Sequence, residues 1–118
     1  MNRFDALFDD HPGAQVLVDR FVVPLQARSE LEAAMRRNTA FLGTLPGFLG
    51  HLVLERDRDA THRELITVVA WQDASSIEHA RQEVRAYYQQ IGFDMPAALG
   101  RWGVTLERGT YSAPRPEQ

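Results

Sequence analysis

The spacing of apolar residues along the chain changes period several times, and each change marks a predicted element. Clusters of β-branched and aromatic residues are typical of strands, and four such segments lie at residues 16–23, 48–56, 63–71 and 102–111. Apolar residues recur every three to four positions in residues 29–42 and 73–91, which predicts two amphipathic helices. The predicted order is β-α-β-β-α-β, the ferredoxin-like pattern of an α+β fold with one four-stranded antiparallel sheet.

Polar and turn-forming residues set the expected boundaries. Residues 57–62 are predicted as a charged hairpin loop, and residues 93–100 as a short irregular turn. The hairpin charges are expected to be solvated, namely Arg56, Asp57, Arg58, Asp59, Arg63 and Glu64. The expected organisation is an N-terminal arm at residues 1–15, one domain at 16–111 and a C-terminal tail at 112–118.

Both faces of the predicted sheet are apolar. In the first strand Val16, Val18 and Val22 point to one side, and Leu17 and Phe21 point to the other. Two helices cover only one face, and a bare apolar face of four strands exceeds what a soluble monomer normally exposes. We therefore expect a homodimer with sheet facing sheet, a dimeric α+β barrel, that encloses a cavity lined by strand residues.

Composition and charge limit the kinds of partner and cofactor that we expect. The chain has 118 residues with 13 basic and 16 acidic side chains, a net charge of −3, so a nucleic-acid partner is not expected. It has no cysteine, and its four histidines show no metal-binding spacing, so neither a metal nor a thiol-based site is expected. The chain has no long apolar run, which favours a cytoplasmic protein without a membrane partner.

Two motifs are similar to a known family. The sequence LPGFLG at residues 45–50 and the sequence VVAWQDAS at residues 68–75 resemble the antibiotic biosynthesis monooxygenase (ABM) domain family. This resemblance implies a dimeric α+β barrel. It also implies one of several activities, namely oxidation of polycyclic phenols or anthrones by O2 without a cofactor, oxidation of quinols, or haem degradation.

The residues that distinguish the branches of this family are mostly different here. The haem-degrading branch has Asn, Trp and His at the positions of Asp19, Ala80 and Gln90, so haem degradation is not expected. The anthrone-oxidising branch has Asn and Tyr at the positions of Thr67 and Ile77. Only its strand-end tryptophan is retained, as Trp71.

Seven residues are candidates for the site. His51 and Asp19 are candidate catalytic bases, because each is an ionisable group in an apolar strand. The candidate substrate-binding residues are Trp71, Phe21, Leu17, Tyr87 and Tyr88. Each also has a structural interpretation: Asp19 could pair with Arg108, His51 could lie at the sheet rim, and the aromatic residues could be core. The sequence thus predicts a cofactor-independent monooxygenase that binds a small planar aromatic between sheet and helices. The alternative is a non-catalytic dimeric binding protein.

Overall fold

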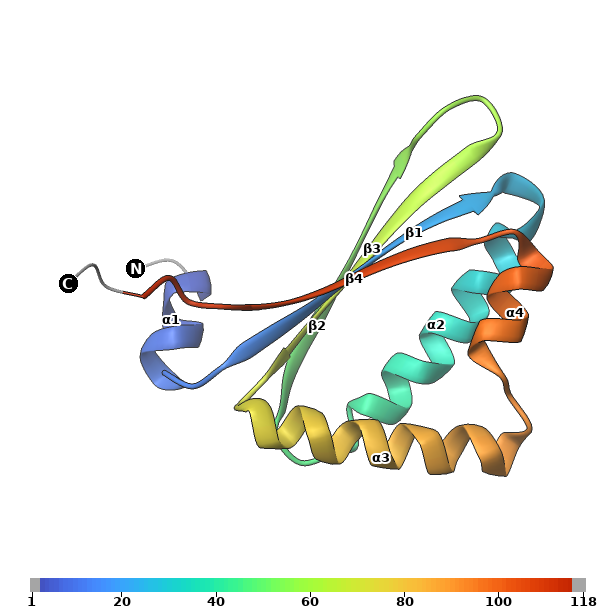
Figure 1. The fold of residues 1–118 in the computed structure, drawn as a ribbon. Coiled ribbons are helices and arrows are strands. Elements are labelled where there is room, and N and C mark those ends of the chain that lie inside the picture. Colours follow the sequence, from blue (N-terminus) through green and yellow to red (C-terminus); the bar gives the residue numbers. More distant parts are fainter. Residues whose placement is uncertain (1–2, 116–118) are drawn as a thin grey trace.

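Four antiparallel strands form one sheet in the order β2-β3-β1-β4 (Figure 1). The computed structural model describes residues 3–115; residues 1–2 and 116–118 of the expected arm and tail lie outside the described part. The strands are β1 Gln15–Pro24, β2 Phe48–Asp57, β3 His62–Trp71 and β4 Thr105–Ser112. The predicted α+β class and antiparallel sheet are confirmed.

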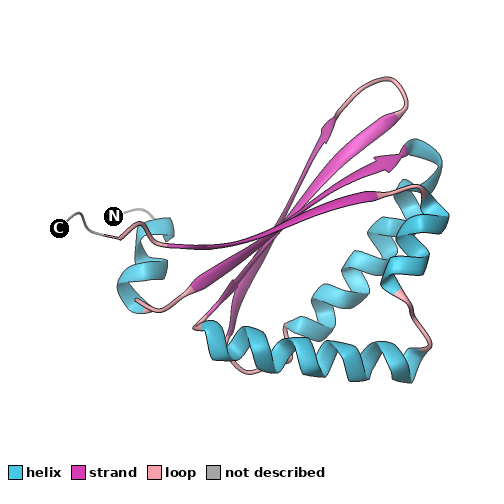
Figure 2. Cartoon of the chain, in the orientation of Figure 1, coloured by secondary structure: helices cyan, strands magenta, loops and turns pink. Residues whose placement is uncertain are grey.

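Three helices, α2 (Arg28–Leu42), α3 (Ala74–Ile91) and α4 (Met95–Trp102), lie on the same side of the sheet (Figure 2). A short 3-10 turn, η1 (Leu25–Ala27), leads from β1 into α2. In the expected N-terminal arm, α1 (Arg3–Asp10) lies by itself at the end of the sheet where β1 begins. Within residues 3–115 no helix is both long and apolar enough to span a membrane.

The third helix corrects the prediction of an irregular turn at residues 93–100. Asp94 caps α4 by accepting a hydrogen bond from the Ala97 amide at 3.0 Å, and Pro96 lies in the first turn. Gly103 ends the helix with φ at +71°, a conformation that glycine adopts without a side-chain penalty. Because the chain is still helical up to Trp102, the last strand begins at Thr105 and not at residue 102.

The loop before β2 packs against the start of α3, and together they hold the end of β3 in place. Gly47 has φ at +84°, and its carbonyl accepts a hydrogen bond from the Gln72 amide at 2.8 Å. A Cβ at this position would lie 2.5 Å from the Cβ of Ser76, so only glycine fits. This contact explains the Pro-Gly-Phe turn, and it sets Trp71 at the edge of the core.

The helix side of the sheet holds two apolar clusters. The first joins Phe21 and Leu65 to α2 and α4, and the second joins Val69 and Trp71 to the start of α3. Strand pairing places Leu17 opposite Val69 and Phe21 opposite Leu65 on this side, and these pairs therefore face the helices.

The opposite side of the sheet, called the open face below, has no helix on it among the described residues (Figure 1). It is formed by alternate residues of all four strands and is mostly apolar; its apolar members are Val16, Val18, Val22, Leu52, Leu54, Ile66, Val68, Ala70 and Tyr111. Leu52, Leu54 and Tyr111 are exposed. The expectation of two apolar sheet faces therefore agrees with the strand register.

One carboxylate is buried on the open face. Glu64 is 2% exposed and forms ion pairs with Arg20, Arg56 and Arg58. The hydrogen bonds from Arg20 and then Arg56 lower the pKa of Glu64. The hairpin charges are thus partly ion-paired, which corrects the expectation that they are merely solvated.

Candidate active site

A cavity of about 820 Å³ lies between the sheet and helices α2, α3 and α4. Its walls come from β1, β3 and β4 on one side and from the three helices on the other. This position agrees with the expected place of the substrate between sheet and helices, and the chamber between two sheets stays a prediction. The volume of the observed cavity is in the range of small-molecule sites.

The inner wall of the cavity is apolar. Trp71, only 2% exposed, ends β3 there, and the edge of its ring meets the Phe48 ring at 5.7 Å between centroids. Leu17 and Phe21 of β1 line the same wall, as predicted. Trp71 is therefore both a core residue and a cavity residue, so its two interpretations are compatible.

Asp19 lies on the polar part of the wall and is paired with Arg108. The two residues are register partners on β1 and β4. Arg108 donates from Nε to Oδ1 of Asp19 at 2.7 Å and from Nη2 to Oδ2 at 2.9 Å. The hydrogen bond to Asp19 raises the pKa of Arg108 against the opposing effect of burial. The predicted ion pair is therefore present, and it lies inside the cavity.

Tyr88 forms the other polar feature of the cavity. Burial raises the pKa of its hydroxyl, against the charges of Arg37 and Arg108 and a hydrogen bond from Asn38. At neutral pH this phenol is protonated and can donate a hydrogen bond to an occupant. The edge of the Phe93 ring packs on Tyr88 with 5.1 Å between centroids.

Tyr87 and His51 lie away from this cavity. Tyr87 stacks on Phe41 at 4.2 Å and is not among the lining residues. His51 is exposed on the edge strand β2 and lines a separate hollow of about 690 Å³ between α2 and β2. Five of the seven predicted residues therefore line one cavity, namely Leu17, Asp19, Phe21, Trp71 and Tyr88.

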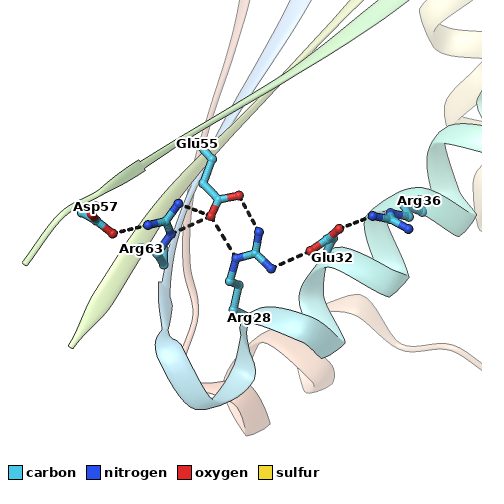
Figure 3. A network of polar contacts seen from close by, with 6 residues as sticks. All are labelled: Arg28, Glu32, Arg36, Glu55, Asp57 and Arg63. Atoms are coloured by element: carbon cyan, nitrogen blue, oxygen red, sulfur yellow. Dashed lines mark hydrogen bonds and ion pairs between the residues drawn. The ribbon is translucent and has the colours of Figure 1, made fainter. Parts of the chain in front are cut away.

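An ion-pair network closes one end of that second hollow and ties α2 to the β2–β3 hairpin. Its members are Arg28, Glu32, Arg36, Glu55, Asp57 and Arg63 (Figure 3). Arg28 donates to the two oxygens of Glu55 at 2.9 and 2.7 Å. The hydrogen bonds from Arg28 and then Arg63 lower the pKa of Glu55. We interpret this cluster as structural, since its charges are matched to one another.

Sequence reasoning missed several cavity residues. Asn38 was visible as a polar residue within the apolar stripe of residues 29–42, and this position was the available signal. Phe93 and Pro96 belong to a stretch predicted as a turn, so their place in the wall could not be foreseen. In the described part of the chain, no three histidine, cysteine or carboxylate side chains gather as a metal site would require.

Comparison with known proteins gives the cavity a context. A mutant of SnoaB, a cofactor-independent oxygenase from Streptomyces nogalater, is 30% identical over 88% of this chain and 96% of its own, with a TM-score of 0.64. A second SnoaB structure is 28% identical over 88% of this chain and 96% of its own, with a TM-score of 0.61. A Nitrosomonas europaea protein, named as a candidate antibiotic biosynthesis monooxygenase, is 15% identical over 90% of this chain and 95% of its own. Its TM-score of 0.66 shows a shared fold.

These matches place the chain in the class of ferredoxin-like α+β proteins, and this class includes monooxygenases. Within that class the chain belongs to the antibiotic biosynthesis monooxygenase family. No family model matches the sequence, and no curated protein matches it. The likeness to SnoaB therefore supports the assignment together with the two motifs.

Proposed function

We propose that this protein is a cofactor-independent monooxygenase that oxidises a small planar phenol, quinol or anthrone-like compound with O2. The observation that carries the proposal is the cavity, which joins an apolar wall ending on Trp71 to a polar part formed by Asp19, Arg108 and Tyr88. SnoaB, a cofactor-independent oxygenase, supports the reaction type. A flat ring packs against the apolar wall, which also excludes water from the reacting carbon.

The reaction starts with loss of a proton from the substrate. Asp94 also lines the cavity, but its carboxylate caps α4. We assign the proton acceptor to Asp19, because each of its oxygens keeps a free lone pair beside the hydrogen bond from Arg108. The substrate anion gives one electron to O2, and the two radicals join in a carbon–oxygen bond to form a peroxide. Loss of water from the peroxide then leaves a carbonyl group. For an anthrone, or a phenol in its keto form, the balance is CH2 + O2 → C=O + H2O. A quinol instead gives two electrons and two protons to O2 and leaves as the quinone with H2O2, so in each case the substrate supplies every electron.

Oxygen uptake with a panel of anthrones, naphthols and quinols tests this proposal. We expect uptake with one compound class, loss of uptake in Asp19→Asn, and unchanged uptake in the control Asp57→Asn, which alters an exposed carboxylate outside the cavity. Absence of uptake across the panel by the wild type would contradict the function. Full uptake by Asp19→Asn would contradict the role of Asp19 alone.

A non-catalytic binding protein is the second candidate. The observation in its favour is that Thr67 and Ile77 line the cavity where the anthrone-oxidising branch has Asn and Tyr. This candidate predicts saturable binding of an aromatic compound with no change in its mass. Mass spectra of the bound compound before and after incubation in air distinguish the two candidates.

We also propose that a second copy of the chain covers the open face. This face is mostly apolar on β1, β2 and β3 and carries Tyr111 on β4, and exposing it to water is unfavourable by roughly 25 cal/mol per Å² of apolar surface. Leu54→Glu, on the open face, should give a monomer by sedimentation. Leu25→Glu is the matched control, because Leu25 is equally exposed but lies outside the sheet. A stable wild-type monomer at micromolar concentration would contradict the proposal.

A further inference from the structure

Arg37 on α2 carries a charge that the described residues leave without a partner. Its Nε and Nη2 atoms are buried and have no hydrogen-bond acceptor. Its guanidinium carbon lies 4.3 Å from the centroid of the Phe93 ring, so the side chain is held in place by stacking. The side chain as a whole is half-buried, but buried N–H groups without an acceptor are unfavourable, and an anion placed nearby would accept from them.

Arg37 does not itself line the cavity, but it is joined to the polar part of the wall through Phe93. Phe93, on which Arg37 stacks, lines the cavity and also contacts Tyr88. The charge of Arg37 acts on the Tyr88 hydroxyl from α2, while that of Arg108 acts on it from β4. Next to Arg37, the Oδ1 atom of Asn38 is likewise buried without a donor. Buried polar atoms without hydrogen-bond partners therefore lie close together at one part of the cavity wall.

The remaining charges of the cavity do not cancel that of Arg37. Both oxygens of Asp19 accept hydrogen bonds from Arg108, and Asp94 is engaged at the start of α4. The cavity lining holds three arginines against two aspartates, because Arg81 and Arg85 lie at the exposed α3 side, where Arg81 is also ion-paired with Glu78. The polar part of the cavity is therefore positive overall, whereas the wall near Trp71 is uncharged.

We propose that the occupant of this cavity is an aromatic anion, a planar ring system bearing an ionised carboxylate or phenolate. Its charged oxygen lies beside Tyr88, which donates a hydrogen bond to it, and Arg37 acts as a positioning residue that stabilises the charge. The ring lies toward Trp71. This inference deepens the proposed function by naming the substrate class, and it adds a reason for the chemistry, since the anion is the electron-rich form that O2 oxidises.

Binding of matched, redox-inert compounds tests the inference without requiring turnover. We would titrate the protein with 2-naphthoate and with its neutral isostere 2-naphthamide, using calorimetry. A charge-assisted contact predicts roughly tenfold tighter binding of the naphthoate. The same comparison of 2,4-dinitro-1-naphtholate with its methyl ether shows whether a phenolate is preferred in place of a carboxylate.

Three variants identify the cation. Arg37→Gln should remove the preference for the anion, and Arg37→Lys should keep most of it because the charge remains. The matched control is Arg36→Gln, which removes the neighbouring arginine, 80% exposed and ion-paired with Glu32 outside this cavity. Equal loss of the preference in Arg36→Gln and Arg37→Gln would overturn the role of Arg37.

The wild-type comparison decides the ligand class even if a variant does not fold. Equal binding of each anion and its neutral isostere, or no binding of either anion at millimolar concentration, would overturn the inference. The two proposals also fail separately. Anion preference without oxygen uptake would contradict only the oxygenase, and oxygen uptake without anion preference would contradict only the charge of the substrate.

Discussion

The Asp19–Arg108 pair gives the sharpest prediction, because its two members differ in exposure. The side chain of Asp19 is 16% exposed and that of Arg108 is 55% exposed. Arg108→Gln leaves a largely buried carboxylate without its cation, whereas Asp19→Asn leaves a cation that reaches water. Removing the cation should therefore be the more costly change. We expect a loss of about 2 kcal/mol in unfolding free energy for Arg108→Gln and about 1 kcal/mol for Asp19→Asn.

Urea unfolding of both single variants and the double variant measures this difference. We expect the double variant to be less destabilised than the sum of the single ones by about 1 kcal/mol, the coupling of a partly exposed charge pair. Oxygen uptake should rank the variants in the opposite order, because Asp19→Asn removes the proton acceptor and Arg108→Gln retains it. Equal destabilisation by the two single changes would refute the burial argument.

Three other changes test separate parts of the structure. Gly47→Ala should lower the unfolding free energy by about 2 kcal/mol or more, because φ is positive there and the new Cβ meets Ser76; a thermal midpoint equal to that of the wild type would contradict the tight turn. The lowered pKa of Glu55 means that its pairing with Arg28 stabilises the fold fully above its ordinary value of 4.5 and less as the pH falls below it. Urea unfolding between pH 6 and 3 should therefore show a steeper loss for the wild type than for Glu55→Gln, and parallel curves would contradict this. His51→Ala should keep the wild-type rate of oxygen uptake, since His51 lies in the other hollow, and a large loss would move the reacting site there.

The period of the strands predicted which residues share a face, except at Phe48, where a bulge between Phe48 and Gly50 shifts the register of β2. It could not predict which strands the cavity covers. His51 pairs with Val69, a cavity residue, so its face was correctly assigned. The order β2-β3-β1-β4 places β2 at the edge, however, and the cavity lies over the other three strands. The ferredoxin-like pattern implies this order, but the place of the cavity depends on how the helices pack on the sheet, which no local pattern encodes. His51 therefore shares a face with the cavity and still lies outside it.

The same limit explains the different outcomes for Asp19 and α4. Asp19 interrupts an apolar strand, and a carboxylate there requires a partner, so Arg108 could be named in advance. For α4, a capping Asp94, a first-turn Pro96 and a terminal Gly103 were all present, but eight residues are too few for a convincing helical period. A buried charge requires a partner at any position in the chain, whereas helical periodicity can be recognised only in a long segment.

The apolar pattern of the strands suggested both a dimer and a cavity, and the location of the cavity makes these two separate conclusions. A barrel of two sheets was expected to enclose a cavity, whereas the substrate was expected between the sheet and the helices. The described walls come from one sheet face and the helices of the same chain. The open face, with the arginine cluster around Glu64, lies on the other side of the sheet from Asp19 and Tyr88. A second copy on that face would support the strands from behind without contributing a wall, so the existence of the cavity does not depend on the oligomeric state.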